Sequence, residues 1–126
     1  MKATKQTEIA RAIERWCYKY AEHREDNQPL YHPLSDGRIY FNGKAWDYNS
    51  QGRKSVIEDI RASEYFQYAD DALVNMTFEG RLYEILNYHW SEEWLGRLYE
   101  EFDALIDGFN CWYELGNAWN LTIYED

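Results

Sequence analysis

Two β-prone runs meet at an Asn-Gly pair, and this feature limits the fold of the chain more than any other. Arg38–Phe41 reads Arg-Ile-Tyr-Phe and Lys44–Tyr48 reads Lys-Ala-Trp-Asp-Tyr, with Asn42 and Gly43 between them. A two-residue type I′ turn needs positive φ at both central positions, and Asn and Gly tolerate that backbone best. The pattern therefore predicts an antiparallel hairpin.

One helix is predicted before this hairpin in the sequence and one after it. The first runs from Lys5 to His23, with Thr4 as its N-cap and Pro29 beyond its end. Its apolar side chains recur at helical spacing and form one face: Ile9, Ile13, Trp16 and Tyr20. The second begins where Ser55 and Glu58 form a capping-box pair.

The second half of the chain predicts five more elements. They are a strand over residues 73–78, a short helix over 81–87, a longer helix over 92–107, and strands over 109–115 and 119–124. Ser91 is the expected N-cap of the longer helix, Gly108 closes it, and Gly116-Asn117 joins the last two strands. The chain is thus expected to form one α+β domain over residues 1–126, with about four helices packed on an antiparallel sheet of about five strands.

Charge is distributed unevenly along the sequence. Residues 1–63 hold eleven Lys or Arg and nine Asp or Glu, whereas residues 64–126 hold two and fourteen. The net charge of the whole chain is −10. Direct binding to nucleic acid or to an anionic membrane is disfavoured, because phosphate contacts require Lys and Arg. A basic partner is favoured instead.

Other patterns bear on the compartment. No apolar run follows the N-terminus, so no signal peptide is expected, and no stretch of eighteen apolar residues predicts a membrane span. Cys17 and Cys111 both lie among apolar residues, and we interpret them as reduced core thiols. These features favour a cytoplasmic protein without a cofactor.

The helix over residues 92–107 separates apolar from acidic side chains. Its apolar side carries Leu95, Leu98, Phe102, Leu105 and Ile106. Its opposite side carries Glu93, Glu100, Asp103 and Asp107, interrupted by Arg97. Carboxylates three or four residues apart lie about 5–6 Å from one another and repel. Phosphates along a DNA strand follow at a comparable distance, about 3.4 Å of axial rise per nucleotide.

Further acidic residues could extend this stripe if the fold brings them alongside: Asp70, Asp71, Glu92, Glu114, Glu125 and Asp126. The alternative is an ordinary solvated acidic surface. Aromatic residues make up 18% of the chain, and they often anchor protein interfaces. Trp16, Phe41, Phe78 and Phe102 occupy core-periodic positions. Tyr18, Tyr48, Tyr68, Tyr99 and Tyr113 do not, so some of them are expected at the surface.

Two motif patterns in the sequence offer chemistry other than protein binding. Asp47–Glu58 has the spacing of a calcium-binding EF-hand loop, with Gly52 at its sixth place. Gln51 and Lys54 depart from that motif, which leaves calcium binding a minor alternative. His23, His32 and His89 lack the paired spacing of a zinc site. No phosphate loop or nucleophile elbow occurs, so we do not expect an enzyme.

In size, acidity, tyrosine content and its carboxylate-striped helix, the chain resembles the bacterial DNA-mimic proteins. These include phage antirestriction proteins, anti-CRISPR proteins and a neisserial mimic that binds the histone-like protein HU. The resemblance covers composition and length and rests on no motif, so it transfers no residue role. It implies a monomer that occupies the DNA-binding surface of a basic partner, of which an HU-like protein is the first choice.

Two other hypotheses remain open. An immunity protein or antitoxin that blocks a basic nuclease would use the same electrostatics, and failure of DNA to compete would distinguish it. A small-ligand module would instead show a deep pocket lined by tryptophans, namely Trp46, Trp90, Trp112 or Trp119.

Overall fold

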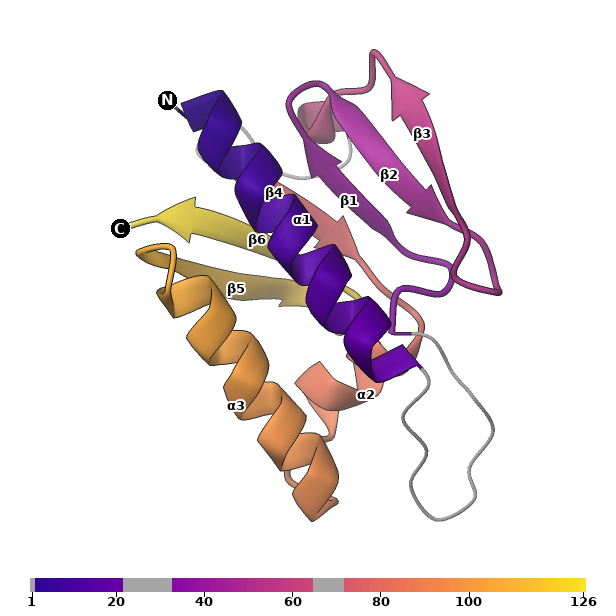
Figure 1. Cartoon of the computed structure of the whole chain (residues 1–126), viewed down its shortest axis with the longest axis vertical. Coiled ribbons are helices and arrows are strands. Elements are labelled where there is room, and N and C mark those ends of the chain that lie inside the picture. Colours follow the sequence, from indigo (N-terminus) through magenta and orange to yellow (C-terminus); the bar gives the residue numbers. More distant parts are fainter. Residues whose placement is uncertain (1, 22–32, 65–71) are drawn as a thin grey trace.

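A computed structural model describes residues 2–21, 33–64 and 72–126 of the chain, and within them an α+β fold (Figure 1). Its helices are α1 (Lys2–Ala21), the 3₁₀ turn η1 (Ala62–Glu64), α2 (Arg81–Asn87) and α3 (Glu93–Asp107). Its strands are β1 (Arg38–Phe41), β2 (Lys44–Tyr48), β3 (Lys54–Glu58), β4 (Val74–Thr77), β5 (Cys111–Asn117) and β6 (Asn120–Glu125). None of the described helices has the length and apolar character needed to cross a membrane.

The strands form one sheet in the order β3-β2-β1-β4-β6-β5, and every neighbouring pair is antiparallel. Helices α1 and α3 lie side by side over one face of this sheet, and α2 packs against α3 at one end (Figure 1). Strands β3 and β5 form the two edges. The α+β class and the antiparallel sheet are confirmed.

The predicted Asn-Gly hairpin is confirmed. Strand β1 pairs with β2 in the register Ile39↔Trp46, and φ is 51° at Asn42 and 72° at Gly43. The turn also contacts α1, because the Asn42 side chain donates a hydrogen bond to Thr7 Oγ1 at 2.9 Å. This contact places the start of α1 over the hairpin.

The prediction that Ser55 and Glu58 begin a helix is wrong, because both residues lie in strand β3. The side chain of Asn49 accepts hydrogen bonds from the Gln51 and Arg53 N–H groups and closes a loop after β2. That loop returns the chain alongside β2, which gains a ladder partner. The β-branched pair Val56-Ile57 suits the strand. This one difference replaces a predicted helix with a sixth strand.

The same strand changes the interpretation of the calcium-type spacing. Strands occupy both sides of the loop, whereas an EF-hand loop lies between two helices. The Asp47 carboxylate, the first position of the motif, accepts a hydrogen bond from Arg38 Nε at 2.6 Å. Asp47 and Glu58 therefore take part in the sheet, at opposite ends of adjacent strands.

The core lies between the helices and one face of the sheet. All four aromatic residues predicted for it are buried: Trp16, Phe41, Phe78 and Phe102. Ile9 and Ile13 of α1 are also fully buried, as are Val74 and Met76 of β4. The predicted apolar face of α1 is thus confirmed for Ile9, Ile13 and Trp16, whereas the Tyr20 side chain, like His23, is outside the described residues.

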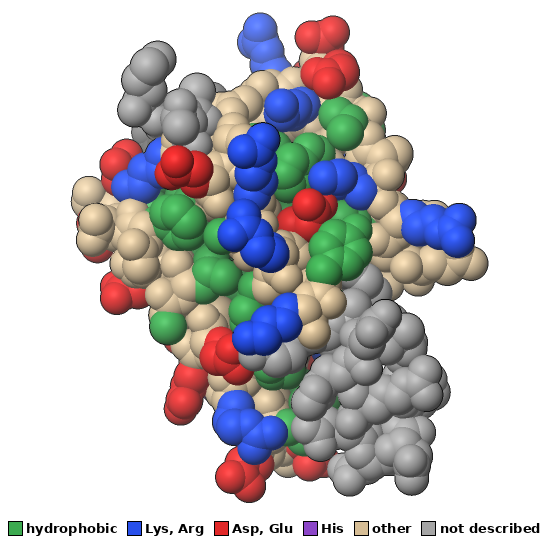
Figure 2. Space-filling model, viewed as in Figure 1, with side chains coloured by type: hydrophobic (Ala, Val, Ile, Leu, Met, Phe, Trp, Pro, Cys, Tyr) green, Lys and Arg blue, Asp and Glu red, His purple; other side chains and the backbone are tan. Residues whose placement is uncertain are grey.

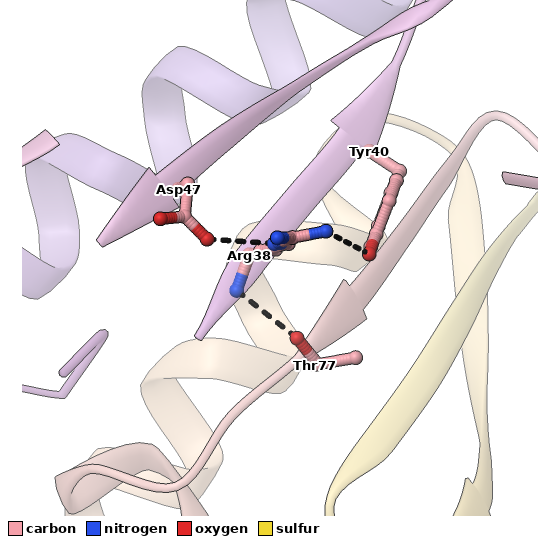
Figure 3. Close-up of polar contacts among 4 residues, drawn as sticks. All are labelled: Arg38, Tyr40, Asp47 and Thr77. Atoms are coloured by element: carbon pink, nitrogen blue, oxygen red, sulfur yellow. Dashed lines mark hydrogen bonds and ion pairs between the residues drawn. The ribbon is translucent and has the colours of Figure 1, made fainter. Parts of the chain in front are cut away.

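The opposite face of the sheet is more polar. Figure 3 shows Arg38 of β1 extended between Asp47 of β2 and the hydroxyl of Tyr40, which accepts from Arg38 at 3.0 Å. The Arg38 N–H donates to Thr77 Oγ1 of β4 at 3.1 Å. These contacts connect three strands without help from a helix. A small apolar cluster of Tyr40, Ala45 and Ile60 lies beside them.

The boundaries of several elements differ slightly from the prediction. Helix α2 is confirmed over its full predicted length, and α1 begins three residues earlier than predicted, so Thr4 lies inside it. The turn between β5 and β6 consists of Ala118 and Trp119, two residues after the predicted Gly116-Asn117. Asn117 N–H instead donates to the Asn120 side chain at 3.2 Å, which extends β5 by two residues.

Candidate acidic interface

Helix α3 is the element that carries most of the candidate residues. Its amphipathic pattern is confirmed: Leu95, Leu98, Phe102 and Ile106 are buried against α1, α2 and the sheet. The N-cap is Glu92, one residue later than predicted, because the Ser91 hydroxyl donates to Tyr88 O at 2.7 Å. Gly108 is the C-cap. The helix thus has a fixed rotation about its axis, and that rotation decides which carboxylates reach solvent.

Three carboxylates of α3 form a straight row, which we call the acidic row: Glu93, Glu100 and Asp107. They are seven residues apart, close to two helical turns, and all three are exposed. Within the part of the chain that the structure describes, none of them forms an ion pair or a side-chain hydrogen bond. The row therefore presents its carboxylates to solvent, with the exposed Arg97 between Glu93 and Glu100 in the sequence.

Asp103 does not belong to this row. It is half-buried, and its carboxylate accepts a short hydrogen bond from the Tyr113 hydroxyl of β5. Burial, followed by this hydrogen bond, raises the pKa of Tyr113 above its ordinary value, so the phenol remains a donor at neutral pH. Asp103 thus connects α3 to the sheet.

Glu125 is also held within the molecule. Lys5 Nζ of α1 lies 3.0 Å from Glu125 Oε1 at the end of β6. This hydrogen bond is the largest cause of the raised pKa of Lys5. The pair joins the two ends of the chain, which lie close together in Figure 1. Its charge is neutralised locally, and it extends no acidic surface.

The remaining candidates are divided among three places. Glu92 adds a carboxylate at the first end of the acidic row. Asp126 adds one near the other end, because its N–H donates to Asn110 O, while Asn110 N–H donates to Asp107 O. Glu114 is exposed on the sheet face opposite α3, since its neighbours Cys111, Tyr113 and Leu115 alternate toward the helix side. Asp70 and Asp71 lie outside the described residues.

Basic side chains occupy a separate region of the surface. Figure 2 shows Lys and Arg gathered over the middle of the helix-covered face, where α1 lies, with most Asp and Glu at its rim. Arg11, Arg15 and Lys19 of α1 are all exposed. Basic side chains therefore gather over α1, whereas the Asp and Glu visible on this face are spread around it (Figure 2).

An open groove of about 680 Å³ runs between α3 and β5. Its walls include Tyr99, Asp103 and Asp107 of α3 and Trp112, Tyr113 and Leu115 of β5. Of the four tryptophans that a ligand pocket was expected to gather, only Trp112 lines this groove. Trp46 is in the core, and Trp90 and Trp119 are exposed.

An exposed tryptophan lies close to the start of the acidic row in the sequence. Trp90 is 75% exposed in the connection between α2 and α3, next to Glu92. In the sequence Trp90 lies between the polar pairs Tyr88-His89 and Ser91-Glu92, and this polar setting indicates that its side chain is exposed. His89 stacks on Tyr99 of α3 with ring centroids 3.8 Å apart, which fixes this connection to the helix. Trp90 therefore extends from a supported backbone.

The tyrosines were expected partly at the surface, and the outcome is mixed. Tyr18 is exposed, which confirms the expectation for one of them, while Tyr99 and Tyr113 are half-buried and Tyr48 is fully buried. Tyr68 lies outside the described residues. The Tyr48 hydroxyl donates to Glu14, so this polar group is satisfied inside the fold.

Both thiols are free and buried, as predicted. Burial, with a contribution from Glu14, raises the pKa of Cys17 well above the ordinary value. Burial also raises the pKa of Cys111, although Lys5 acts in the opposite direction. The reactive thiolate is thus a minor form of either residue at neutral pH.

Comparison of the chain with protein-family models, with curated proteins and with solved structures finds no match.

Proposed function

We propose that this protein is a DNA mimic, which binds the DNA-binding surface of a basic protein through α3 and competes with DNA for it. The observation that carries the proposal is the acidic row. Glu93, Glu100 and Asp107 are exposed on one line of a rigid helix and form no ion pair with any described residue. At the C-terminal end of the helix the row gains nothing for the fold, because the carboxylate of Asp107 opposes the helix dipole there.

The spacing of the row supports this function. Seven residues of α-helix rise about 10.5 Å, and three nucleotides of one DNA strand rise about 10.2 Å. Measured along the helix axis, the rise between successive carboxylates of the row thus matches the axial rise between every third phosphate of a strand. Glu92 and Asp126 add charge at its two ends, so the acidic track is somewhat longer than α3 itself.

The preferred partner is a basic DNA-binding protein, with an HU-like protein as the first choice. A surface that attracts phosphates carries Lys and Arg, and these meet the carboxylates of α3. Trp90, exposed beside the start of the row, supplies the kind of aromatic side chain that is enriched among interface anchors. Neither a cofactor nor direct contact with nucleic acid is part of this function.

The test is competition between the protein and labelled duplex DNA for a purified HU-like protein at low salt. Wild-type protein is expected to displace the DNA. The Glu100→Lys/Asp107→Lys variant is expected to bind at least about tenfold more weakly, about 1.4 kcal/mol. Asp103 is left unchanged in this variant because its reversal would also remove the contact with Tyr113.

A matched control carries the same change of net charge elsewhere. Glu8 of α1 and Glu58 of β3 are exposed and form no described ion pair, so Glu8→Lys/Glu58→Lys is expected to retain most of the affinity. Equal loss in both variants would show that only net charge matters and would contradict the proposed role of α3. Absence of any complex at low salt would reject the function itself.

A further inference from the structure

Strand β5 is an edge strand without lysine or proline, and its ladder with β6 is regular from Cys111 to Leu115, before a bulge between Leu115 and Asn117. Exposed edges are commonly blunted by lysine, proline or inward-pointing charge, because unpaired backbone groups can recruit another strand. The other edge, β3, begins with Lys54 and follows this rule. The seven residues of β5 include no lysine and no proline, and no other described strand pairs with its outer side.

The ladder shows which backbone groups of β5 point outward. The backbone N–H of Leu73, the residue before β4, donates to the carbonyl oxygen of Ile123 at 2.8 Å. The backbone hydrogen-bonding groups of Ile123 therefore point toward β4. Hydrogen-bonding directions alternate along a strand, and therefore Thr122 and Tyr124 face β5. Their register partners Glu114 and Trp112 face β6 in return. The N–H and C=O groups of Cys111, Tyr113 and Leu115 consequently point away from the sheet.

Apolar side chains are exposed along the same edge. Trp112 is 45% and Leu115 38% exposed, on opposite faces of the strand. The Trp112 ring stacks on Tyr124 of β6 at 4.6 Å between centroids, which holds it in place. An added strand would thus find an apolar contact on each face of β5, in addition to backbone hydrogen bonds.

The charge beside this edge is negative. Asp103 and Asp107 line the groove between α3 and β5, and Glu114 is exposed on the other face of the strand. No Lys or Arg lines the groove. A strand that enters here is therefore favoured when its own side chains are basic.

We propose that β5 accepts an extended basic segment of a partner protein, which adds to the sheet as a further antiparallel or parallel strand. The free backbone groups of Cys111, Tyr113 and Leu115 supply the ladder. The carboxylates of the groove and Glu114 select Lys and Arg. The identity of the partner rests on the proposed function, whereas the strand addition itself can be tested without that partner.

The probe is the peptide acetyl-Lys-Val-Arg-Val-Lys-Val-Arg-amide, with affinity measured by calorimetry and contacts mapped by amide NMR. Binding should shift and protect the Cys111, Tyr113 and Leu115 amides. Two further peptides carry N-methyl groups on alternate residues, in the two possible registers. Strand addition requires that one of them loses binding and the other retains it, because only one edge of the peptide faces β5.

Matched variants place a lysine on each edge of the sheet. Leu115→Lys should weaken peptide binding at least about tenfold, since it sets a like charge beside the peptide. Val56→Lys, at an exposed position of β3, should change it less than about twofold, since surface changes elsewhere act weakly. Thermal unfolding establishes that both variants are folded.

Several results would overturn the inference. These are no peptide binding, equal effects of Leu115→Lys and Val56→Lys, or loss of binding by both N-methylated peptides or by neither. A dimer detected by sedimentation and broken by Leu115→Lys would assign the edge to a second copy of the chain instead. Peptide binding without DNA competition would reject the mimic alone, and DNA competition without peptide binding would reject the edge alone.

Discussion

Glu14 connects three elements through one carboxylate. Glu14 lies in α1, and its carboxylate accepts a hydrogen bond from the hydroxyl of Tyr48 in β2. Lys54 Nζ of β3 lies 3.0 Å from the same carboxylate. Tyr48 could therefore be buried although its hydroxyl is polar, because a partner is available inside the fold. Its burial depends on a residue 34 positions earlier in the chain.

Removal of the Tyr48 hydroxyl tests this contact. Tyr48→Phe is expected to lower the free energy of unfolding by about 1 kcal/mol, because Glu14 loses a donor but retains Lys54 and some water. Urea denaturation measures the change. Tyr124→Phe is the control, because the Tyr124 hydroxyl forms no hydrogen bond with the described residues. This control substitution should alter stability much less. An effect of equal size in both would show that the Glu14 contact contributes nothing.

Stability is expected to fall at alkaline pH. The folded pKa values of Cys17, Tyr48 and Tyr113 are all raised, chiefly by burial. Below pH 9.0 for the thiol and pH 10.0 for the phenols, the folded and unfolded states both keep these protons, so the groups make a constant contribution to stability. Above pH 9 for the thiol and pH 10 for the phenols, the unfolded state releases protons that the folded state retains, which favours unfolding.

Thermal midpoints between pH 8 and 12 measure this decline. The Tyr48→Phe variant should lose less stability than wild type between pH 10 and 12, because one phenol no longer titrates. Identical slopes for the two proteins would contradict a raised pKa at Tyr48.

At the scale of elements, the β1–β2 hairpin was predictable because its determinants are local. Asn42 and Gly43 supply the positive φ angles of the turn, and the flanking residues favour strands. Strand β3 was not predictable in this way. Ser55 and Glu58 satisfy a helical start signal, and only the ladder with β2 shows that Val56 and Ile57 belong to a sheet.

A substitution at Gly43 measures the local contribution. A Cβ there would meet no atom within 4 Å, so Gly43→Ala adds no clash and only strains a backbone at φ +72°. We expect a loss of about 1 kcal/mol in the free energy of unfolding. Gly43→Asn should cost less, because Asn tolerates this region better. Chemical denaturation of both variants tests the order, and a neutral Gly43→Ala would contradict the turn assignment.

At the scale of the whole molecule, exposed basic side chains gather over α1, whereas α3 carries the acidic row (Figure 2). Long-range attraction steers association, and salt screens it with a Debye length of about 8 Å at physiological ionic strength. The division follows from packing, since α1 and α3 lie side by side with their charged sides turned to solvent.

Association of the protein with an HU-like partner should therefore be strongly salt-dependent. Between 50 and 300 mM salt we expect the association rate constant to fall about tenfold or more, with a smaller change in dissociation. Stopped-flow fluorescence measures both rates. The salt dependence should be shallower for Glu100→Lys/Asp107→Lys than for Glu8→Lys/Glu58→Lys. Equal salt dependence would indicate that α3 does not direct the encounter.

The candidate site was predictable only in part. The apolar pattern of α3 correctly placed Glu93, Glu100 and Asp107 on its exposed side, because helical periodicity alone sets that side. The same pattern could not show that Tyr113 binds Asp103, or that Lys5 binds Glu125, since these partners are joined by strand register and chain topology. The groove and the free edge of β5 required the strand order.

The amino-acid sequence by itself determined the Asn-Gly turn, the amphipathic helices and the unequal charge of the two halves. These follow from residue type and short-range spacing. Tertiary structure alone decided that residues 54–58 form a strand, which carboxylates of the second half stay free, and which edge of the sheet is left open. The physical reason is that a side chain's environment depends on what packs against it, and those neighbours come from distant parts of the chain.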